Sequence, residues 1–219
     1  MQAKAWLGRL QALLIEMAVN RSRRTYLSAA IASVLLPSVA LASQREETLA
    51  DNVASTMRRS VNNVSPARLV FSTPQAGRQW MYAMSSQLSR FIPDARERET
   101  LLLNIQYEAK RAGLDVQLIL GLVEVESMFR RYAISGVGAR GLMQVMPFWV
   151  RHIGTTGHNL FDIRTNLRYG CTILRYYIDR ERGDVTRALA RYNGSLGSLT
   201  YPNKIYAAMR RNWIYNGAV

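Results

Sequence analysis

The chain has 219 residues, of which 48% are apolar and 20% charged, and its formal net charge is +14. This size and apolar content fit one compact domain with additions at its N-terminus. The single cysteine, Cys171, excludes an intrachain disulfide, and with two histidines, His152 and His158, it forms no pattern of metal ligands. We therefore expect no metal and no cofactor.

Residues 1–42 have the features of a targeting segment. The basic stretch 21–28 (RSRRTYLS) precedes an apolar run over 29–41, and small residues end it at Ala42. We expect cleavage after Ala42. The paired arginines followed by Tyr and Leu also fit a twin-arginine signal, so both export routes stay open, as does an uncleaved anchor. No later run approaches the roughly 20 apolar residues that span a bilayer, so we expect no membrane span after cleavage.

The charge balance bears on the partner. Residues 1–42 contain five basic residues and one acidic residue, so their removal leaves a net charge of +10. Such a surplus favours a polyanionic partner and speeds encounter with it. The sequence lacks the interleaved basic and aromatic residues of a nucleic-acid-binding module, so we expect no nucleic-acid partner. A solvated basic surface without a specific partner remains an alternative.

Residues 43–93 are predicted to form an N-terminal lead. The part up to about residue 74 has a weak helical pattern interrupted by Pro66 and Pro74, and we expect it to be flexible. Residues 75–92 are predicted as a helix packed on the domain. The apolar side chains on one face of this helix, which we expect in the core, are Trp80, Met84, Leu88 and Phe91.

The remaining residues, 94–219, are predicted to form a mainly α-helical domain. A helix over 96–112 ends at Gly113, and Asp115 caps a second helix that reaches residue 129. In that second helix Glu126 falls on the apolar side, whereas Glu124 falls about 200° away and is predicted to be solvated. Burial disfavours a charged carboxylate, so we expect a raised pKa for Glu126 and a capacity for general acid catalysis.

A turn with several glycines follows this helix. Glycines such as Gly138 and Gly141 permit positive φ values and close approach of backbone groups to a ligand. The side chain of Gln144 offers two hydrogen-bond donors and an acceptor, and Met143 offers a pliable apolar wall. The alternative is an ordinary loop with Met143 in the core and Gln144 exposed.

This region resembles the core signature of the soluble lytic transglycosylase and goose-type lysozyme family. The matching positions are Glu126-Ser127, Ser135, Gly138-Ala139, Gly141-Leu142-Met143-Gln144 and Met146-Pro147. So many fixed residues at fixed offsets make a specific motif. The resemblance implies a lysozyme-like fold with an open glycan-binding groove and Glu126 as the catalytic residue. The substrate-binding residues that it implies are Ser127, Ser135, Gly141, Leu142, Met143, Gln144, Tyr192, Asn193 and Tyr201.

The resemblance continues downstream and covers about residues 105–213. The segment 159–170 matches a scaffold helix, and 188–194 matches an Ala-Tyr-Asn-x-Gly motif in which Tyr192 orients the acid or the sugar. Arg191 departs from this motif, where alanine is common. Tyr201 corresponds to a tyrosine that contacts the acid, although its sequence context supports it less strongly than that of Tyr192.

The resemblance implies cleavage of bacterial cell-wall glycan in the periplasm. With one acid in the motif, the substrate's 2-acetamido group would assist, and the product would be a 1,6-anhydro end. A lysozyme-type hydrolase and a non-catalytic peptidoglycan-binding protein of an envelope complex are the alternatives. The other downstream carboxylates, which we expect at helix caps or on the surface, are Asp162, Asp179, Glu181 and Asp184.

Overall fold

The computed structural model describes residues 44–63 and 65–217. The targeting segment and cleavage position predicted for residues 1–42 lie outside this part of the chain. The described residues contain helices and two isolated β-bridges, which join Ile134 to Arg140 and Arg140 to Val145. The predicted mainly α-helical fold is thus confirmed.

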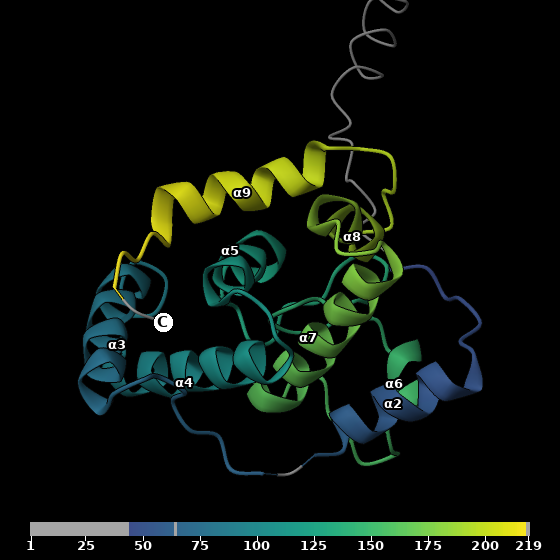
Figure 1. The fold of residues 1–219 in the computed structure, drawn as a ribbon, viewed down its shortest axis with the longest axis horizontal. Coiled ribbons are helices and arrows are strands. Elements are labelled where there is room, and N and C mark those ends of the chain that lie inside the picture. Colours follow the sequence, from purple (N-terminus) through teal and green to yellow (C-terminus); the bar gives the residue numbers. More distant parts are fainter. Residues whose placement is uncertain (1–43, 64, 218–219) are drawn as a thin grey trace, which may run out of the picture. The chain divides into compact units, whose positions relative to one another are not determined.

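The helices follow one another along the chain, and a long loop over residues 128–147 separates α5 from α6 (Figure 1). They are α2 (Asp51–Val61), α3 (Pro74–Leu88), α4 (Ala95–Arg111), α5 (Val116–Ser127), α6 (Phe148–Ile153), α7 (Ile163–Arg180), α8 (Val185–Tyr192) and α9 (Thr200–Asn212). None of the described helices is long and apolar enough to cross a membrane.

Helix α5 is the buried centre of the domain. Most of its residues are buried, and the partly exposed ones are Gln117, Val125 and Glu126. Figure 1 shows α9 running along one side of α5, with α4 and α7 below it. At Gly121, an added Cβ would come within 2.8 Å of Met209 Cγ and 3.1 Å of the Ile205 carbonyl oxygen. Glycine at this position therefore lets α5 and α9 approach closely.

Four helices begin with an aspartate whose carboxylate accepts a hydrogen bond from a backbone amide three residues later. The predicted cap at Asp115, which accepts from Leu118 at 2.8 Å, is confirmed. Such caps satisfy amides that have no partner inside the helix. The capping residues are Asp94, Asp115, Asp162 and Asp184.

The N-terminal lead is more ordered than its sequence pattern indicates. The helix predicted over residues 75–92 is present as α3 but ends at Leu88, and Trp80, Met84 and Leu88 are buried as expected. Phe91, which was predicted on the same buried face, lies beyond the end of the helix and is partly buried. However, the segment predicted to be flexible contains α2, and its residues Met57 and Val61 are also buried. Helix α2 is therefore part of the packed domain.

Long-range hydrogen bonds explain why α2 is held in place. Arg111 on α4 donates to the Ser60 carbonyl oxygen at 3.2 Å, and Arg168 on α7 donates to that of Val61 at 3.3 Å. These carbonyls belong to the last turn of α2, which lacks partners within the helix. The buried carboxylate of Glu108 orients both guanidinium groups. A local sequence pattern cannot predict these contacts, because they join residues that lie far apart in the chain.

Candidate active site

Glu126 is the penultimate residue of α5. The chain leaves the helix abruptly, because Met128 and Phe129 both have left-handed backbone conformations, with φ values of 52° and 61°. Phe129 is buried, and its ring lies 5.1 Å from that of Phe91 and 5.2 Å from that of Trp213. The strained backbone at Phe129, which this aromatic cluster holds in place, thus helps to fix the position of the acid.

The side chain of Glu126 is mostly buried and has one neutral polar partner. Tyr201 donates a hydrogen bond to its Oε1 atom. Burial raises the pKa of Glu126 to about 7, although the hydrogen bond from Tyr201 lowers it in part. The predicted raised pKa is confirmed. Near neutral pH, both the protonated and the ionised carboxyl are populated, as a group that acts first as an acid and then as a base requires.

Tyr201 lies in the first turn of α9 and is buried. Burial and the adjacent carboxylate of Glu126 raise its pKa well above the ordinary value. The phenol therefore stays protonated and remains a donor. The contact with the acid that the resemblance implies for Tyr201 is therefore confirmed, although the sequence context supported Tyr192 more strongly.

Tyr192, at the end of α8, contacts the glycine-containing loop through its hydroxyl group. Its side chain is fully buried, and its hydroxyl donates to the carbonyl oxygen of Met143 at 2.7 Å. Burial, and secondarily the charge of Glu126, raise its pKa well above the ordinary value. The described contacts thus make Tyr192 a positioning residue for the loop.

Asn166 on α7 makes three hydrogen bonds, two of which hold the same loop. Its Oδ1 atom accepts from the Met143 amide at 2.8 Å, and its Nδ2 atom donates to the carbonyls of Arg140 and Leu160, both at 2.8 Å. Gly141 makes this contact possible, because it has a φ value of 74° and an added Cβ would lie 2.4 Å from Asn166 Nδ2. The sequence resemblance placed this asparagine in a scaffold helix, without these partners.

Several predicted substrate-binding side chains lie inside the scaffold. Ser127 is buried and donates to the Val123 carbonyl, while Leu142 and Met143 are buried in the core. An added Cβ on Gly170 would lie 2.3 Å from Met143 Sδ, so Met143 fills the space that this glycine leaves. The contacts with substrate predicted for these residues stay predictions, and their side chains face inward.

The remaining predicted residues hold the loops that surround the acid. Gln144 is also buried, and its Nε2 atom donates to the Ala133 and Gly141 carbonyls at 3.2 and 2.9 Å. Ser135 is partly exposed and accepts from the Ala139 amide, and Asn193 donates to Ser195. Their contacts with substrate also remain predictions.

Glu124 is not the solvated carboxylate that its helical position indicated. It is 9% exposed, and it accepts hydrogen bonds from Asn212 Nδ2 at 2.7 and 2.9 Å and from Trp213 Nε1 at 2.7 Å. The prediction was wrong because α9 and the residues after it cover that side of α5. Glu124 joins the C-terminal segment to the central helix.

The other downstream carboxylates are engaged elsewhere, as expected. Asp162 and Asp184 cap helices, Asp179 pairs with Arg175 at 2.6 Å, and Glu181 pairs with both Arg187 and Arg191. The structure assigns none of these four carboxylates a contact with Glu126.

Exposed apolar side chains, none of which belongs to the sequence motif, lie on two segments that flank Glu126 in the fold. One segment follows α5, where Tyr132 is 69% exposed and its ring lies 6.0 Å from that of Phe161. The other precedes Tyr201 on α9. Such side chains can pack against the apolar faces of sugar rings. They are Met128, Tyr132, Ile134, Leu196 and Leu199.

Residues 44–49, which we call the strap, cross the domain beside the site. Gln44 is buried, and its Oε1 atom accepts from the Met146 amide at 3.3 Å. Glu47 pairs with Arg180 and, at 3.3 Å, with Arg191. Arg191 also pairs with Glu181 at 2.5 Å. The departure of Arg191 from the family motif is thus explained by its link to the strap.

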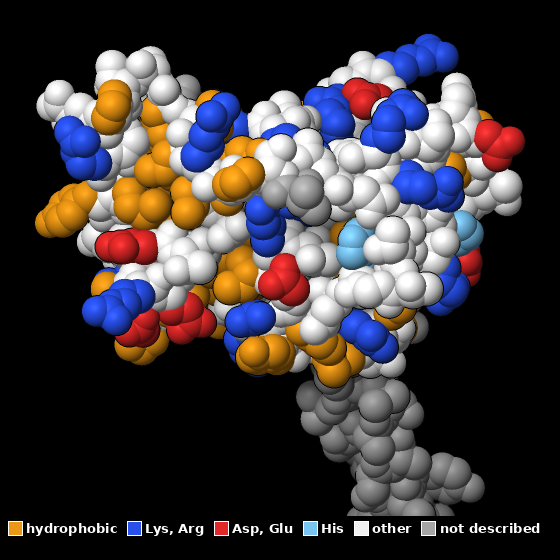
Figure 2. Space-filling model, turned by 90° about the horizontal axis from the view of Figure 1, so that it is seen from below, with side chains coloured by type: hydrophobic (Ala, Val, Ile, Leu, Met, Phe, Trp, Pro, Cys, Tyr) orange, Lys and Arg blue, Asp and Glu red, His pale blue; other side chains and the backbone are white. Residues whose placement is uncertain are grey.

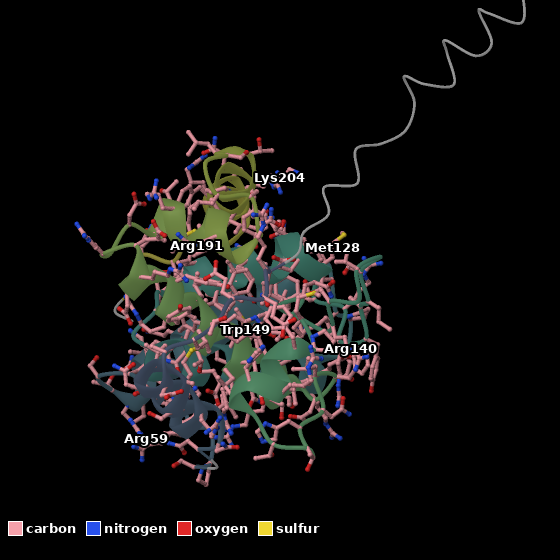
Figure 3. The ribbon with its side chains drawn as sticks, turned by 90° about the vertical axis from the view of Figure 1, so that its right-hand side faces the viewer. Arg59, Met128, Arg140, Trp149, Arg191 and Lys204 are labelled. Carbon is pink, nitrogen blue, oxygen red and sulfur yellow. The ribbon has the colours of Figure 1, made fainter. Side chains whose placement is uncertain are left out.

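The basic surplus is distributed over the surface. Figure 2 shows Lys and Arg side chains spread across one face of the domain instead of gathered in one patch. In Figure 3, Lys204 on α9 lies toward the upper end of the view, and Arg59 on α2 lies toward the lower end. This distribution fits an extended anionic partner better than a single bound ion.

Comparison with known proteins identifies related domains. The family model described as "Transglycosylase SLT domain" matches residues 103–212. A transglycosylase of Enterobacteria phage PRD1 is 38% identical over 100 residues, which make up 42% of this chain and 37% of that protein. The membrane-bound lytic murein transglycosylase C of Actinobacillus pleuropneumoniae (serotype 5b) is 35% identical over 123 residues, or 52% of this chain and 32% of that protein.

Among solved structures, the lytic transglycosylase Slt of Pseudomonas aeruginosa aligns with 77% of this chain and 33% of that chain, at 20% identity and a TM-score of 0.39. The aligned segments span about a third of the length of the curated relatives.

Proposed function

Because the chain belongs to the transglycosylase SLT domain family, we propose that it is a lytic transglycosylase of bacterial peptidoglycan. It cleaves the β-1,4 bond between N-acetylmuramic acid and N-acetylglucosamine and leaves a 1,6-anhydro end on the muramic acid. The observation that supports this proposal best is the mostly buried Glu126, with a pKa of about 7 and a hydrogen bond from Tyr201.

In the first step, protonated Glu126 donates its proton to the glycosidic oxygen as the bond to muramic C1 breaks. The positive charge that develops at C1 is stabilised by the carbonyl oxygen of the substrate's own 2-acetamido group. This assistance replaces the second carboxylate of ordinary glycosidases. The engagement of Asp162, Asp179, Glu181 and Asp184 with caps and arginines supports a mechanism with one acid.

In the second step, the Glu126 carboxylate removes the proton from the muramic C6 hydroxyl. The C6 oxygen attacks C1, displaces the acetamido oxygen and closes the anhydro ring, and Glu126 is protonated again. The reaction consumes no water, because the C6 hydroxyl takes the place of a water nucleophile. A group whose pKa lies near the working pH suits both proton transfers.

Other residues support the acid without taking part in bond breaking. Tyr201 orients the carboxyl and stabilises its ionised form, since its phenol donates to Oε1. Tyr192 and Asn166 hold the loop at Met143 from two sides. The backbone of this loop and the exposed apolar residues near Tyr132 would line the glycan groove.

The partner and the location follow from the same proposal. The substrate is the glycan strand of the cell wall, whose carboxylates complement the net charge of +10 that remains after residues 1–42 are removed. The protein acts in the periplasm after export and cleavage behind Ala42. An envelope-spanning complex, for which the wall must be opened, is a further proposed partner.

The first test is the release of soluble fragments from purified, insoluble peptidoglycan. We expect release by the native chain and a loss of at least about a thousandfold in Glu126→Gln, because general acid catalysis and the subsequent base step both disappear. Glu99→Gln, on the exposed face of α4, is the matched control and should retain full activity. Full activity of Glu126→Gln would refute the proposal, and binding to the wall without release by any form would favour a non-catalytic role.

A further inference from the structure

A basic stretch without acidic residues follows the catalytic helix. Residues 127–161 contain four arginines and neither aspartate nor glutamate. One of them, Arg151, pairs with Glu46 on the strap, whereas Arg130, Arg131 and Arg140 form no ion pair within the described residues. Protein surfaces usually mix charges of both signs, so a patch of one sign indicates a partner of the opposite charge.

Two aromatic rings connect the arginines of this patch. The guanidinium carbon of Arg131 lies 5.2 Å from the centre of the Tyr132 ring, and that ring lies 6.0 Å from the ring of Phe161. The guanidinium carbon of Arg140 lies 5.8 Å from the Phe161 ring, and Arg131 Nε donates to the Phe161 carbonyl oxygen at 2.7 Å. Arg131 and Arg140 therefore both adjoin Phe161. Contact with the rings restricts the two side chains and so reduces the entropy that they lose when a ligand binds.

The guanidinium groups of the patch can be reached from solvent. Arg130 and Arg140 are exposed, and Arg131 is partly exposed. The Nε atom of Arg130 donates to the Ser127 carbonyl oxygen at 3.0 Å, as that of Arg131 does to Phe161. The terminal nitrogens of Arg131 have no acceptor within the part of the chain that the structure describes, and neither of them is buried. An anion can therefore approach these donors from outside.

The patch adjoins the loop that carries the sequence motif. The Ala133 carbonyl oxygen accepts from the Gly141 amide at 2.9 Å and from Gln144 Nε2 at 3.2 Å. In Figure 3, Met128, which follows α5, and Arg140 both lie toward the right side of the view. A cavity of about 470 Å³ opens beside this loop, and it is lined by Arg130, Tyr132, Ala133 and Ile134. A glycan strand bound at the proposed acid can thus extend a side group over the patch.

The carboxylates next to the patch in the sequence have other partners. Glu126 accepts from Tyr201, and Asp162 caps α7. The patch therefore keeps its positive charge, while Tyr132 and Ile134, which are 69% and 65% exposed, add apolar surface. A ligand that fits both features carries several carboxylates and small apolar groups along one chain.

We propose that this patch binds the stem peptides of peptidoglycan through their free carboxylates. The carboxylates accept from Arg130, Arg131 and Arg140, and alanine methyl groups of the peptide pack against the exposed ring of Tyr132. Guanidinium groups suit carboxylates because several N–H donors are held in one plane. An extended tetrapeptide is about 13 Å long, enough to pass from one side of Phe161 to the other. The choice of the stem peptide rests on the proposed function, since muramic acid carries both the cleaved bond and the peptide.

The consequence is a preference among substrate strands. A strand whose peptides carry free carboxylates binds at the patch while its glycan lies at Glu126. A strand whose peptide carboxylates are amidated keeps the glycan contacts and loses the ionic ones. Because the patch is exposed, the preference should shrink as salt is added.

The test compares fragment release from two peptidoglycan samples that differ only in whether the peptide carboxylates are free or amidated. At subsaturating substrate we expect the native chain to release fragments about tenfold faster from the free form, as for a few exposed ion pairs acting together. In the double variant Arg131→Gln, Arg140→Gln this ratio should fall to about twofold or less. A ratio is insensitive to a general loss of activity or of folded protein. The matched control Arg78→Gln, Arg96→Gln removes two exposed arginines on α3 and α4 and should keep the native ratio.

Equal release from the two samples by the native chain, or an unchanged ratio in the double variant, would overturn the proposal. An equal fall in the control would also overturn it, because net charge alone would then explain the preference. Release without preference leaves the proposed function intact. If the native chain releases nothing from either sample, the proposed function fails, and isothermal titration of the Glu126→Gln chain then tests the patch alone. Tighter binding of the free than of the amidated tetrapeptide, lost on adding Arg131→Gln and Arg140→Gln, would support the patch, and equal binding would exclude it.

Discussion

Tyr201 donates a hydrogen bond to the carboxyl group of Glu126, although 75 residues separate them in the chain. The contact exists because α9 lies along α5, and Gly121 allows the two helices to come close. Burial raises the pKa of Glu126 to about 7, and this hydrogen bond opposes the rise. The balance of the two effects sets the protonation state of the proposed catalytic acid.

Removal of the Tyr201 hydroxyl should therefore change the pH profile. In Tyr201→Phe the carboxylate loses its donor, so the pKa of Glu126 rises further above its ordinary value. Activity requires the protonated acid in the first step, so the native activity should fall as the pH rises above about 7. This alkaline limb should move to higher pH in Tyr201→Phe, with a maximal rate about tenfold lower. Tyr206→Phe, on the same helix, is the control, and an unshifted limb in Tyr201→Phe would exclude this role.

The same pKa predicts the pH dependence of stability. A carboxyl whose pKa is raised from 4.5 to about 7 on folding contributes stability that is fully present below pH 4.5 and is lost as the pH rises through 7. At pH 8 the free energy of unfolding of Glu126→Gln should therefore be about 1–3 kcal/mol higher than that of the native chain. At pH 5 the difference should largely vanish. Urea unfolding at both pH values measures it, and a difference that does not depend on pH would contradict the raised pKa.

Glu124 should contribute to the stability of the fold and take no part in the catalytic steps. Its replacement by alanine leaves the Asn212 amide and the Trp213 indole without their acceptor and frees the end of α9. We expect a loss of about 2–4 kcal/mol in the free energy of unfolding, as for other buried polar groups that lose a partner. Glu99→Ala is the exposed control. A loss below about 0.5 kcal/mol would show that these bonds contribute little.

Both the oxygen and the nitrogen of the Asn166 side-chain amide should contribute to the stability of the chain. Asn166→Asp keeps the acceptor for the Met143 amide but loses the donor to the Arg140 and Leu160 carbonyls, so it should destabilise the chain about as much as Asn166→Ala. We expect about 2–3 kcal/mol for each, measured by urea unfolding. Asn104→Ala, whose amide bonds to its own helix, is the control. A stable Asn166→Asp would contradict this account of the loop.

The strap should loosen when Arg191 is removed. Arg191→Ala deletes the ion pair with Glu47, so amide hydrogen exchange of residues 44–49 should become about five to ten times faster. Arg187→Ala is the matched control, because Arg187 pairs with the same Glu181 but has no described bond to the strap. Equal exchange in both variants would show that Arg191 does not hold the strap.

The sequence predicted those features that depend on local patterns. Helical periodicity placed Glu126 on the apolar side of α5, and a capping aspartate marked the start of that helix at Asp115. The helical spacing of Trp80, Met84 and Leu88 predicted α3. These predictions succeed because the periodicity and the caps act within a few residues of the chain.

The features that the sequence did not predict depend on distant partners. Glu124 is buried because α9 covers it, and α2 is ordered because Arg111 and Arg168 reach its last turn. Tyr192 donates to the Met143 carbonyl, and not to the acid as the resemblance implied, because of where α8 lies. Each of these contacts joins residues at least 49 positions apart, a separation at which a periodic pattern carries no information.

The most direct test of the proposed mechanism is the chemical nature of the new muramic end. Peptidoglycan is digested with the native chain and, in parallel, with Glu126→Gln, and the released fragments are identified by mass spectrometry. The account predicts 1,6-anhydro ends, 18 mass units lighter than hydrolysed ends by the loss of one water, from the native chain and not from the variant. Reducing ends from the native chain would show a hydrolase, and anhydro ends at an undiminished rate from Glu126→Gln would show that Glu126 is not the acid.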